Sequence, residues 1–479
     1  MMYRQSLPLP IAALVATLLL ILAGCAARPP VQQQGSGAMA DLDADSRFHA
    51  AQHDAPRPTE ADLRWWTRFG DDELARWVER ALAANTDIAL ARERQAETRA
   101  ALRAAEGRRM PQLVAAARVD ASSRQSANQR RIEPALLLRL DWDADLWGEL
   151  RADERAAAAT LAARRFETQA ARLSTAALTA RAYLAWQQAR LDLQARRDAL
   201  ALWRETARVV GIRVDAGLSP KLDGLRADGE LAAAQAAVID AAASVREAER
   251  PLQLLTATRP GAPIASASPP RLPIAPGASA DGAAASAAAL PVVLPLDLLR
   301  LRPDLQAAEQ ALRAAEAAVD AAAAAERPSL RLPGVLTLGT AGGSALLATV
   351  AAELAAPLFD GGQREAASDA ARARLRAAEL GYRQAVQQAL AQTEAALHAH
   401  RTALDALTAL HEAVRAADAA VQQARILYDN GLAGFLELLE AQRNAVTRRQ
   451  SLRNQQADLV RSAVAAYEAM GLMPPDSPE

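Results

Sequence analysis

Two hydrophobic periodicities run through this chain, and each predicts a different kind of element. Large apolar residues return at steps of 4, 7, 7, 3, 7 and 7 positions in the second half: Val386, Leu390, Leu397, Leu404, Leu407, Val414 and Val421. This heptad-like seam is typical of a long helix that packs as a coiled coil. Residues 113–122 and 136–143 instead alternate apolar and polar positions, which predicts two strands.

Landmarks recur in the same order in both halves of the chain, which indicates an internal duplication. A predicted helix opens at Asp87 and meets Pro111 24 positions later (111 − 87), and a second opens at Asp304 and meets Pro328 after the same interval (328 − 304). A strand-like stretch, a long helix and a glycine turn follow each proline. Shared alanine-rich composition would not align prolines and glycines in this way.

Each repeat is therefore predicted to contain a helix, two strands, a very long helix, a turn and another long helix. The very long helix of the first repeat runs from about Gly148 to Val214, which corresponds to about 100 Å at 1.5 Å per residue. No globular core is that long, so coiled-coil packing must support it. The glycine turns fall at Gly217 and Gly431.

The predicted strands allow two interpretations. A half-buried sheet of a soluble protein alternates in the same way, but an apolar side facing lipid and a polar side facing water is the signature of a transmembrane barrel. Two strands per repeat give four per chain. Four strands cannot close, an open edge is not tolerated in lipid, and membrane barrels begin at about eight strands. In the membrane interpretation the chain must therefore oligomerise.

Charge excludes one class of partner. Lys and Arg total 55 and Asp and Glu total 56, so the formal net charge is −1. Binding of nucleic acid normally shows as a basic excess or stripe, and neither is present. Abundant Ala, Leu, Arg, Glu and Gln favour helix on intrinsic propensity, in agreement with a mainly α fold that has a small β part.

The single cysteine, Cys25, follows a short apolar run, Ile11–Leu22, that is too short to span a membrane but suits a signal peptide. The run ends in Leu22-Ala23-Gly24-Cys25, which resembles the lipobox of bacterial lipoproteins, where the signal is removed and the cysteine is lipidated. The alternative is an ordinary signal peptide with an incidental thiol. Ala26, rather than Asp, resembles the sorting pattern of lipoproteins sent to the outer membrane.

The predicted organisation has six parts. They are a signal peptide (1–24), a lipidated tether (25–58), a first repeat (59–257), a Pro/Ala/Ser-rich connector (258–295), a second repeat (296–471) and a tail (472–479).

Catalytic motifs are missing from the sequence. It has no HExxH, no glycine-rich phosphate loop and no GxSxG elbow. His398, His400 and His411 share one predicted helix, where solvated surface positions are a better interpretation than a metal site. We therefore expect no enzyme activity, no metal, and no cofactor apart from the covalent lipid on Cys25.

Five stretches in order resemble the TolC/NodT family of outer-membrane efflux channels, in its lipidated branch. They are Trp65–Phe69 followed by Asp72 and Leu74, Leu140–Gly148 (LDWDADLWG), Leu299–Leu305 (LRLRPDL), Pro357–Gly362 (PLFDGG) and Tyr428–Arg443 (YDNGLAGFLELLEAQR). The resemblance implies a homotrimer whose chains give four strands each to one 12-stranded transmembrane barrel, continued by a periplasmic helical tunnel. It also implies partners: outer-membrane lipid, a periplasmic adaptor (membrane fusion protein) and an inner-membrane pump of the RND type.

The same resemblance suggests roles for residues near the glycine turns. Glu437 and Glu440 match two acidic residues that ring the constriction of the tunnel. Asp223 and Tyr428 match members of a latch that holds the tunnel closed. The basic member of that latch is replaced by Ala433, and Arg213, which is within reach of the turn, is a candidate substitute. The adaptor-docking tip is expected to contain Val210, Gly211, Ile212, Arg213, Gly217 and Gly431.

Taken from the residues alone, the two glutamates have a plainer interpretation. They lie on the polar side of a helix whose apolar side carries Phe435, Leu438 and Leu439, where Glu440 can pair with Arg443. In a trimer, six such carboxylates would form a ring that attracts cations.

The predicted function is a passive outer-membrane exit duct for drugs or other toxic small molecules. The alternatives are a non-conducting, lipid-anchored periplasmic scaffold and a type I protein-secretion duct of the same fold. The duplicated strands favour a duct, because a scaffold has no need of them.

Overall fold

The computed structural model describes residues 48, 57–124, 129–264, 268–273, 290–291, 293–339 and 345–474. The chain divides into two units, Met1–Asp43 and Ala44–Glu479, and all described residues belong to the second. Cys25, the predicted signal peptide and most of the predicted tether therefore lie outside the described residues.

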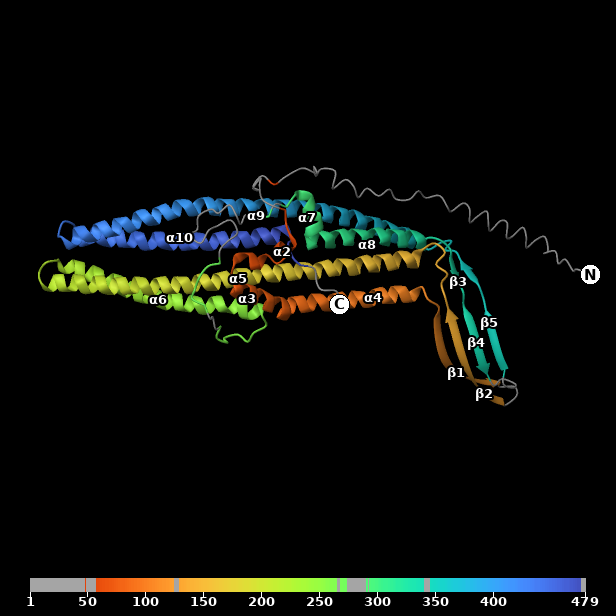
Figure 1. Cartoon of the computed structure of the whole chain (residues 1–479). Helices are drawn as coiled ribbons and strands as arrows, with labels where there is room; N and C mark the ends of the chain where they lie inside the picture. The colour runs from red at the N-terminus through yellow and green to blue at the C-terminus, as the bar shows by residue number, and fades with distance from the viewer. Residues whose placement is uncertain are drawn as a thin grey trace, which may run out of the picture. The chain divides into compact units, whose positions relative to one another are not determined.

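Two helices of 67 residues dominate the second unit: α5 (Glu149–Asp215) and α9 (Gln363–Asp429). Each is about 100 Å long at 1.5 Å per residue. α5 turns back into α6 (Lys221–Leu255) and α9 turns back into α10 (Phe435–Met470), so that each repeat contains a long hairpin of helices (Figure 1). The predicted very long helix of the first repeat is confirmed.

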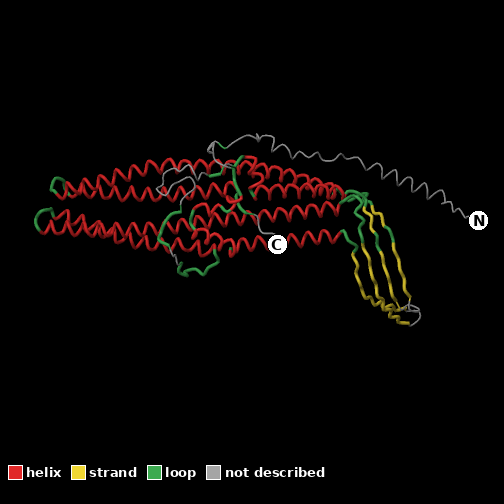
Figure 2. The backbone as a smooth tube through the Cα atoms, viewed as in Figure 1, coloured by secondary structure: helices red, strands yellow, loops and turns green. Residues whose placement is uncertain are grey.

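The duplicated unit is confirmed element by element. In the first repeat α4 (Thr86–Arg108) precedes β1 and β2, and in the second α8 (Pro303–Ala325) precedes β3 to β6. Both α4 and α8 have 23 residues. The strands lie together at one end of the helices, and the two glycine turns lie at the other (Figure 2).

The seam between α9 and α10 follows a heptad, but not through all of the predicted residues. Val386 and Leu407 are buried, whereas Leu390, Leu397 and Leu404 are only half-buried. The buried positions at steps of seven are Val386, Thr393, His400, Leu407 and, three heptads further on, Tyr428, with Ala389, Ala403 and Ala417 on the neighbouring line. Alanine allows the two helices to approach closely, and small or polar side chains then occupy seam positions that a pattern of large apolar residues does not include.

The strands form one antiparallel sheet in the order β1-β2-β4-β5. β1 (Gln112–Arg124) pairs with β2 (Gln129–Asp141), and β2 of the first repeat pairs with β4 (Gly334–Gly339) of the second. β4 then pairs with β5 (Ala345–Val350). The second hairpin continues toward the helices as a short ribbon of β3 (Ser329–Arg331) and β6 (Glu353–Ala355), separated from β4 and β5 around Pro333.

The register places apolar residues from all four strands on one face of the sheet. Ala117 is opposite Leu136, Leu136 is opposite Leu338, and Leu338 is opposite Leu346. Leu136, Leu338 and Leu346 are exposed in the single chain, at 59%, 49% and 69%. The opposite face carries charged and hydroxyl side chains such as Arg118, Arg139 and Thr337, because side chains alternate along a strand. The alternation predicted for the first two strands is confirmed.

Short elements before α4 form an aromatic core against the long helices. They are α2 (Glu60–Leu63), the 3-10 helix η1 (Trp65–Phe69) and α3 (Asp72–Ala84). Trp65 stacks on Tyr467 of α10, with 5.7 Å between ring centres. The carboxylate of Asp71 accepts hydrogen bonds from the first turn of α3 and from the hydroxyl of buried Tyr183 in α5 (3.0 Å). This core fixes the N-terminal part of the described chain to both hairpins.

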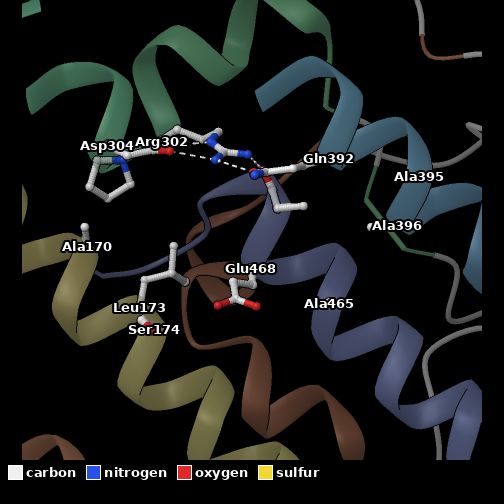
Figure 3. A pocket seen from close by; sticks show the side chains of 12 residues that line it. Ala170, Leu173, Ser174, Arg302, Asp304, Gln392, Ala395, Ala396, Ala465 and Glu468 are labelled. Atoms are coloured by element: carbon white, nitrogen blue, oxygen red, sulfur yellow. Dashed lines mark hydrogen bonds and ion pairs between the residues drawn. The ribbon is translucent and has the colours of Figure 1, made fainter. Parts of the chain in front are cut away.

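The start of the second repeat is held by a buried arginine. α7 (Pro295–Leu301) ends at Arg302, whose guanidinium pairs with Asp304 (2.6 Å) and donates to the carbonyl of Ala469 and the side chain of Gln392. A cavity of about 590 Å³, lined by residues of α5, α8, α9 and α10 that include five alanines, lies beside it (Figure 3). Arg302 therefore ties α8 to α9 and to the end of α10, which gives the RPD stretch a structural role.

Among the described residues, no helix combines the length and apolar content that crossing a membrane would require.

Candidate functional site at the hairpin tips

The two glycine turns close the helical hairpins with the same backbone motif. Gly217 follows α5 with φ +72° and Gly431 follows α9 with φ +73°. In each turn the residue after the glycine donates to the carbonyl five positions earlier: Leu218 to Arg213 (2.7 Å) and Leu432 to Leu427 (2.8 Å). This is the Schellman arrangement, in which glycine accepts the left-handed conformation without strain. The turn after the very long helix is thus built in both repeats by the same backbone hydrogen bond and the same left-handed glycine.

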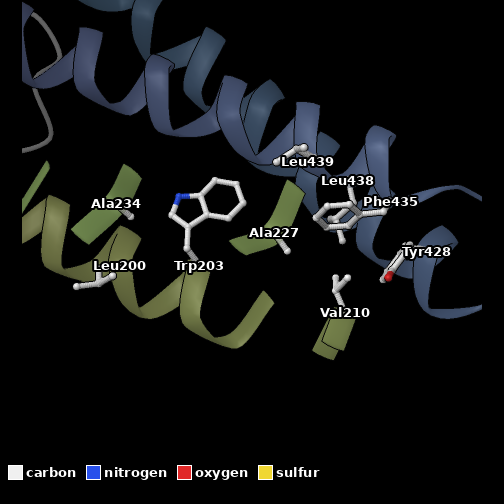
Figure 4. Close-up of a cluster of buried hydrophobic side chains, with 9 residues drawn as sticks. All are labelled: Leu200, Trp203, Val210, Ala227, Ala234, Tyr428, Phe435, Leu438 and Leu439. Atoms are coloured by element: carbon white, nitrogen blue, oxygen red, sulfur yellow. The ribbon is translucent and has the colours of Figure 1, made fainter. Parts of the chain in front are cut away.

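A buried cluster joins the two hairpins just behind these turns (Figure 4). It contains Leu200, Trp203 and Val210 of α5, Ala227 and Ala234 of α6, Tyr428 of α9, and Phe435, Leu438 and Leu439 of α10. The apolar side predicted for the start of α10 is confirmed, since its three members are at most 5% exposed. Because the cluster draws on both repeats, it packs the two hairpins of one chain against each other.

Arg213 and Tyr428 make the most specific contact between the hairpins. The guanidinium of Arg213 lies over the ring of Tyr428, 4.7 Å from its centre. The same ring packs at 6.1 Å from Phe435. Tyr428 is 4% exposed, and its hydroxyl has no hydrogen-bond partner among the described residues. The ring face, rather than the hydroxyl, therefore carries the interaction, as a cation–π contact.

The other predicted latch residues are not brought to Tyr428. Asp223 forms an ion pair with Arg226 of its own helix, at 3.6 Å. Ala433, at the position where the family resemblance predicts a basic residue, is half-buried in the second turn and offers no charge. The cation that contacts the Tyr428 ring in the described structure is Arg213 of α5.

Glu437 and Glu440 are both exposed, unlike their neighbours Leu438 and Leu439 in the cluster. Glu437 lies in the first turn of α10 and its carboxylate folds back over Gly434, where an added Cβ would come within 2.9 Å of Oε2. A carboxylate at a helix N-terminus is favoured by the free N–H groups there. Both glutamates are therefore free to face a shared axis if copies of the chain assemble around one.

The plainer interpretation predicts an ion pair between Arg443 and Glu440, but Arg443 pairs with a different acid in the described structure. Its guanidinium forms an ion pair with Glu230 of α6. The hydrogen bond to Glu230 is the main cause of a raised pKa of Arg443, and the charge of Glu440 adds to it. This ion pair is a second link between the hairpins. It has no signal in the sequence, because residues 230 and 443 lie far apart along the chain.

The predicted docking residues divide into buried and exposed positions. Val210 is 1% exposed and belongs to the buried cluster, so the prediction that it forms part of a docking surface is wrong for this structure. Ile212 is 57% exposed, and Leu218, next to Gly217, is 70% exposed. Trp203 was also missed as a member of the site. Its spacing of seven from Val210 is the signal that could have found it.

Metal-ligating groups do not gather anywhere in the described part of the chain. The prediction that the helix histidines are solvated is wrong for His400, which is 6% exposed and has Nδ1 3.1 Å from the hydroxyl of Ser462 in α10. It serves the packing of α9 on α10.

The tip geometry, the duplicated hairpins and the shared sheet together describe a recognised architecture. The family model described as "Outer membrane efflux protein" matches residues 77–258 and 294–472. The chain belongs to this family. The two matched segments correspond to the two repeats of the outer membrane efflux protein described above.

Individual relatives resemble this outer membrane efflux protein over nearly their whole length. "Cation efflux system protein CusC" of Escherichia coli is 25% identical over 461 residues, which cover 94% of this chain and 97% of the relative. "Toluene efflux pump outer membrane protein TtgI" of Pseudomonas putida is 26% identical over 95% of this chain and 96% of the relative. The solved structure of the outer-membrane channel OprN aligns with a TM-score of 0.77 at 29% identity, over 90% of this chain and 98% of that one.

Membership of the family establishes the general role of this outer membrane efflux protein. It is an outer-membrane channel component, and its task is to provide the exit from an efflux system. The family consists of transport proteins.

Proposed function

We propose that three copies of this chain form a passive exit duct for small toxic molecules, and that the duct carries out no chemistry on them. The observation that carries the proposal is the four-stranded sheet. Among the described strands, β1 and β5 each pair on one side only, and the sheet exposes an apolar face. Unpaired backbone groups are costly in lipid. Copies that join at these edges satisfy them, and three copies supply twelve strands, as the family resemblance implies.

The hairpin tips are proposed to be the gate of this duct. The Arg213–Tyr428 contact and the buried cluster hold the two hairpins of each chain together. With three chains around one axis, Glu437 and Glu440 would supply six carboxylates. Such a ring favours cations over anions in the passage.

The exposed apolar side chains of the tips suit a partner protein. Ile212, Leu218 and Leu222 of the first hairpin are more than half exposed, and so are Ile426 and Leu432 of the second. We assign this surface to a periplasmic adaptor, which would connect the duct to an inner-membrane pump of the RND type. A lipid on Cys25 would anchor the chain to the outer membrane.

The cargo is proposed to be small and toxic because similar proteins are named for such cargo. CusC is named for cation efflux and TtgI for toluene efflux. A cation and toluene are chemically very different cargoes. The two names therefore support a proposal of small toxic molecules in general and do not favour one compound.

Planar-bilayer recordings on the purified, lipidated protein test the proposal. A trimer that resists detergent and gives a cation-selective conductance is the expected result. A trimer without conductance would favour the scaffold, and a monomer without conductance would contradict the duct. Expression in a strain that lacks its own outer-membrane exit component separates small-molecule efflux from type I protein secretion: restored resistance to small toxic compounds is expected, and restored secretion of a protein alone would favour the latter.

A further inference from the structure

The elements of the two repeats align at two constant sequence offsets, and these offsets give a rule for the contacts between copies. α8 begins and ends 217 positions after α4 (86 to 303 and 108 to 325). α9 begins and ends 214 positions after α5 (149 to 363 and 215 to 429). The strands obey the same two offsets: the pair Gln112–Asp141 of the first hairpin becomes Ser329–Ala355, a pair of the second.

Inside one chain, the first repeat already contacts the second through defined pairs. Leu140 of β2 is opposite Gly334 of β4, and the same ladder continues to Ala144, whose N–H donates to the carbonyl of Leu330 (3.0 Å). On the helices, Arg155 of α5 pairs with Asp320 of α8 at 3.0 Å. In a closed ring of copies, the second repeat of one copy must meet the first repeat of the next. Because the two repeats are similar, we expect the contacts between copies to match the contacts between the repeats inside one chain.

We infer that the β5–β6 edge of one copy pairs with β1 of the next copy in a single register, in which Thr349–Leu358 lies antiparallel to Leu113–Ser122. Adding the offset of 214 to Leu140 gives Leu354 of one copy, and subtracting the offset of 217 from Gly334 gives Ala117 of the next. The in-chain pair Leu140–Gly334 therefore predicts a pair between Leu354 of one copy and Ala117 of the next. The last in-chain pair, Ala144–Leu330, becomes Leu358 and Leu113. This inference rests on the proposed trimer and specifies how its copies join.

The exposed apolar residues fit this register. Leu358 is 93% exposed and Leu113 is 63% exposed in the single chain, and the register places them opposite each other. Leu354, 47% exposed, meets Ala117 on the same apolar face. Pro357 falls between two hydrogen-bonded pairs, at a position equivalent to Asp143. Its missing N–H therefore does not interrupt the ladder to the next copy.

Charges on the polar face fit the register as well. Asp143 is opposite Arg331, and Arg331 is opposite Glu353, within one chain. The offsets place Arg118 of the next copy opposite Glu353. Acidic and basic residues then alternate across the four neighbouring strands, from Asp143 to Arg118 of the next copy. Unlike charges that lie directly opposite each other stabilise an antiparallel sheet.

The helices give an independent agreement. The offsets convert the in-chain pair Arg155–Asp320 into Asp369 of α9 and Arg103 of α4 in the next copy. The signs are exchanged, but the pair still joins unlike charges. Asp369 also pairs with Arg372 of its own helix at 2.9 Å, but its side chain remains 67% exposed, and Arg103 is also exposed. Chance placement would as readily produce two like charges at this point.

Disulfide trapping in cell envelopes tests the register directly. The inferred pair Ala116–Ala355 is not hydrogen-bonded, so its Cα atoms should lie about 4.5 Å apart, which suits a disulfide. The variant with Ala116→Cys and Ala355→Cys is expected to form linked multimers on mild oxidation. Val114→Cys with Ala355→Cys is the matched control, because a diagonal pair about 7–8 Å apart is too distant. The parent, with Cys25 alone, is the second control.

The outcomes separate this inference from the proposed function. Linking only in the Ala116–Ala355 variant supports the register. Linking in the control pair instead, with a detergent-resistant trimer, overturns the register and leaves the duct intact. Absence of linking together with a monomeric parent overturns both.

Charge exchange provides a measurement that does not depend on disulfide geometry. Asp369→Arg and Arg103→Asp alone are each expected to lower the temperature at which the trimer dissociates in detergent, and the double variant is expected to restore it. If the double variant instead lowers the dissociation temperature by the sum of the two single effects, the inferred pair between Asp369 and Arg103 is contradicted. Asp418→Arg, which removes the partner of Arg449 inside one chain, is the control that Arg103→Asp should not rescue.

Discussion

Arg213 places its guanidinium 4.7 Å from the centre of the Tyr428 ring, and this contact joins α5 of the first hairpin to α9 of the second. The family resemblance predicts a basic latch residue at position 433, where this chain has alanine. The cation comes instead from the helix that faces the ring. In the described structure, the cation beside the Tyr428 ring is therefore supplied by α5.

Removal of Arg213 should loosen the tip. A cation–π contact contributes about 0.5–2 kcal/mol, so Arg213→Ala should shift the closed-to-open ratio by about 2- to 30-fold, since 1.4 kcal/mol is a factor of ten. Single-channel recording measures this as larger or longer openings. Arg208→Ala is the matched control, because Arg208 pairs only with Glu205 of its own helix in the described structure. Tyr428→Phe should behave like the parent, and an effect as large as that of Arg213→Ala would refute the ring-face contact.

Neutralising the two tip glutamates should reduce cation selectivity. Glu437→Gln combined with Glu440→Gln removes six carboxylates from a trimer without changing side-chain size. Reversal potentials in asymmetric KCl should move toward zero. Glu79→Gln in α3, whose side chain pairs with Arg64, removes three charges elsewhere and should leave the potential unchanged. An unaltered potential in the double variant would mean that these residues do not line the passage.

The cluster behind the turns should respond very differently to two adjacent substitutions. Phe435 is 2% exposed and Leu436 is 43% exposed. Phe435→Ala removes a buried ring and should cost about 3–5 kcal/mol locally, whereas Leu436→Ala should have little effect. Amide hydrogen exchange along the start of α10 measures the difference. Similar exchange in both variants would show that the cluster does not hold the hairpins together.

Alkaline pH should weaken the aromatic core of the N-terminal elements. Burial, followed by the charge of Asp71, raises the pKa of Tyr183 above its usual value, and burial raises the pKa of Tyr467 to about 12. The folded state therefore holds these phenol protons more tightly than the unfolded state. The resulting stabilisation is complete below about pH 10 and is lost as the pH rises through the folded pKa values.

Thermal unfolding measured from about pH 8 to 11 should show this loss. Tyr183→Phe and Tyr467→Phe should each make the melting temperature fall less steeply above pH 10, and the double variant should flatten the curve further. Identical slopes in the parent and both variants would contradict the assignment.

Much of the fold could be predicted from the sequence, because its signals are local or periodic. Helix length follows from the distance between Gly148 and Gly217, and the duplication follows from prolines and glycines at matched spacing. Strand faces follow from alternation over residues 113–119 and 136–141, which the register confirms.

The remaining features of the candidate site could not be predicted, because they depend on contacts between residues that are far apart in the sequence. Val210 looks like a tip residue, yet the second hairpin covers it. Arg443 has an acid three positions away at Glu440, yet it pairs with Glu230 across the hairpins. The burial of His400 was missed for a related reason: in an alanine-rich seam, the packing distance rather than residue polarity decides which side chains are covered.

The equal lengths of α5 and α9 constrain how such a chain can change over evolutionary time. A deletion in one of these helices would rotate its seam by about 100° per residue and leave its turn at a different depth from the other turn. Matched changes of seven residues in all four hairpin helices preserve both the seam and the level of the turns. The reach of the hairpins is therefore adjustable only in steps of about 10 Å, made simultaneously in both repeats.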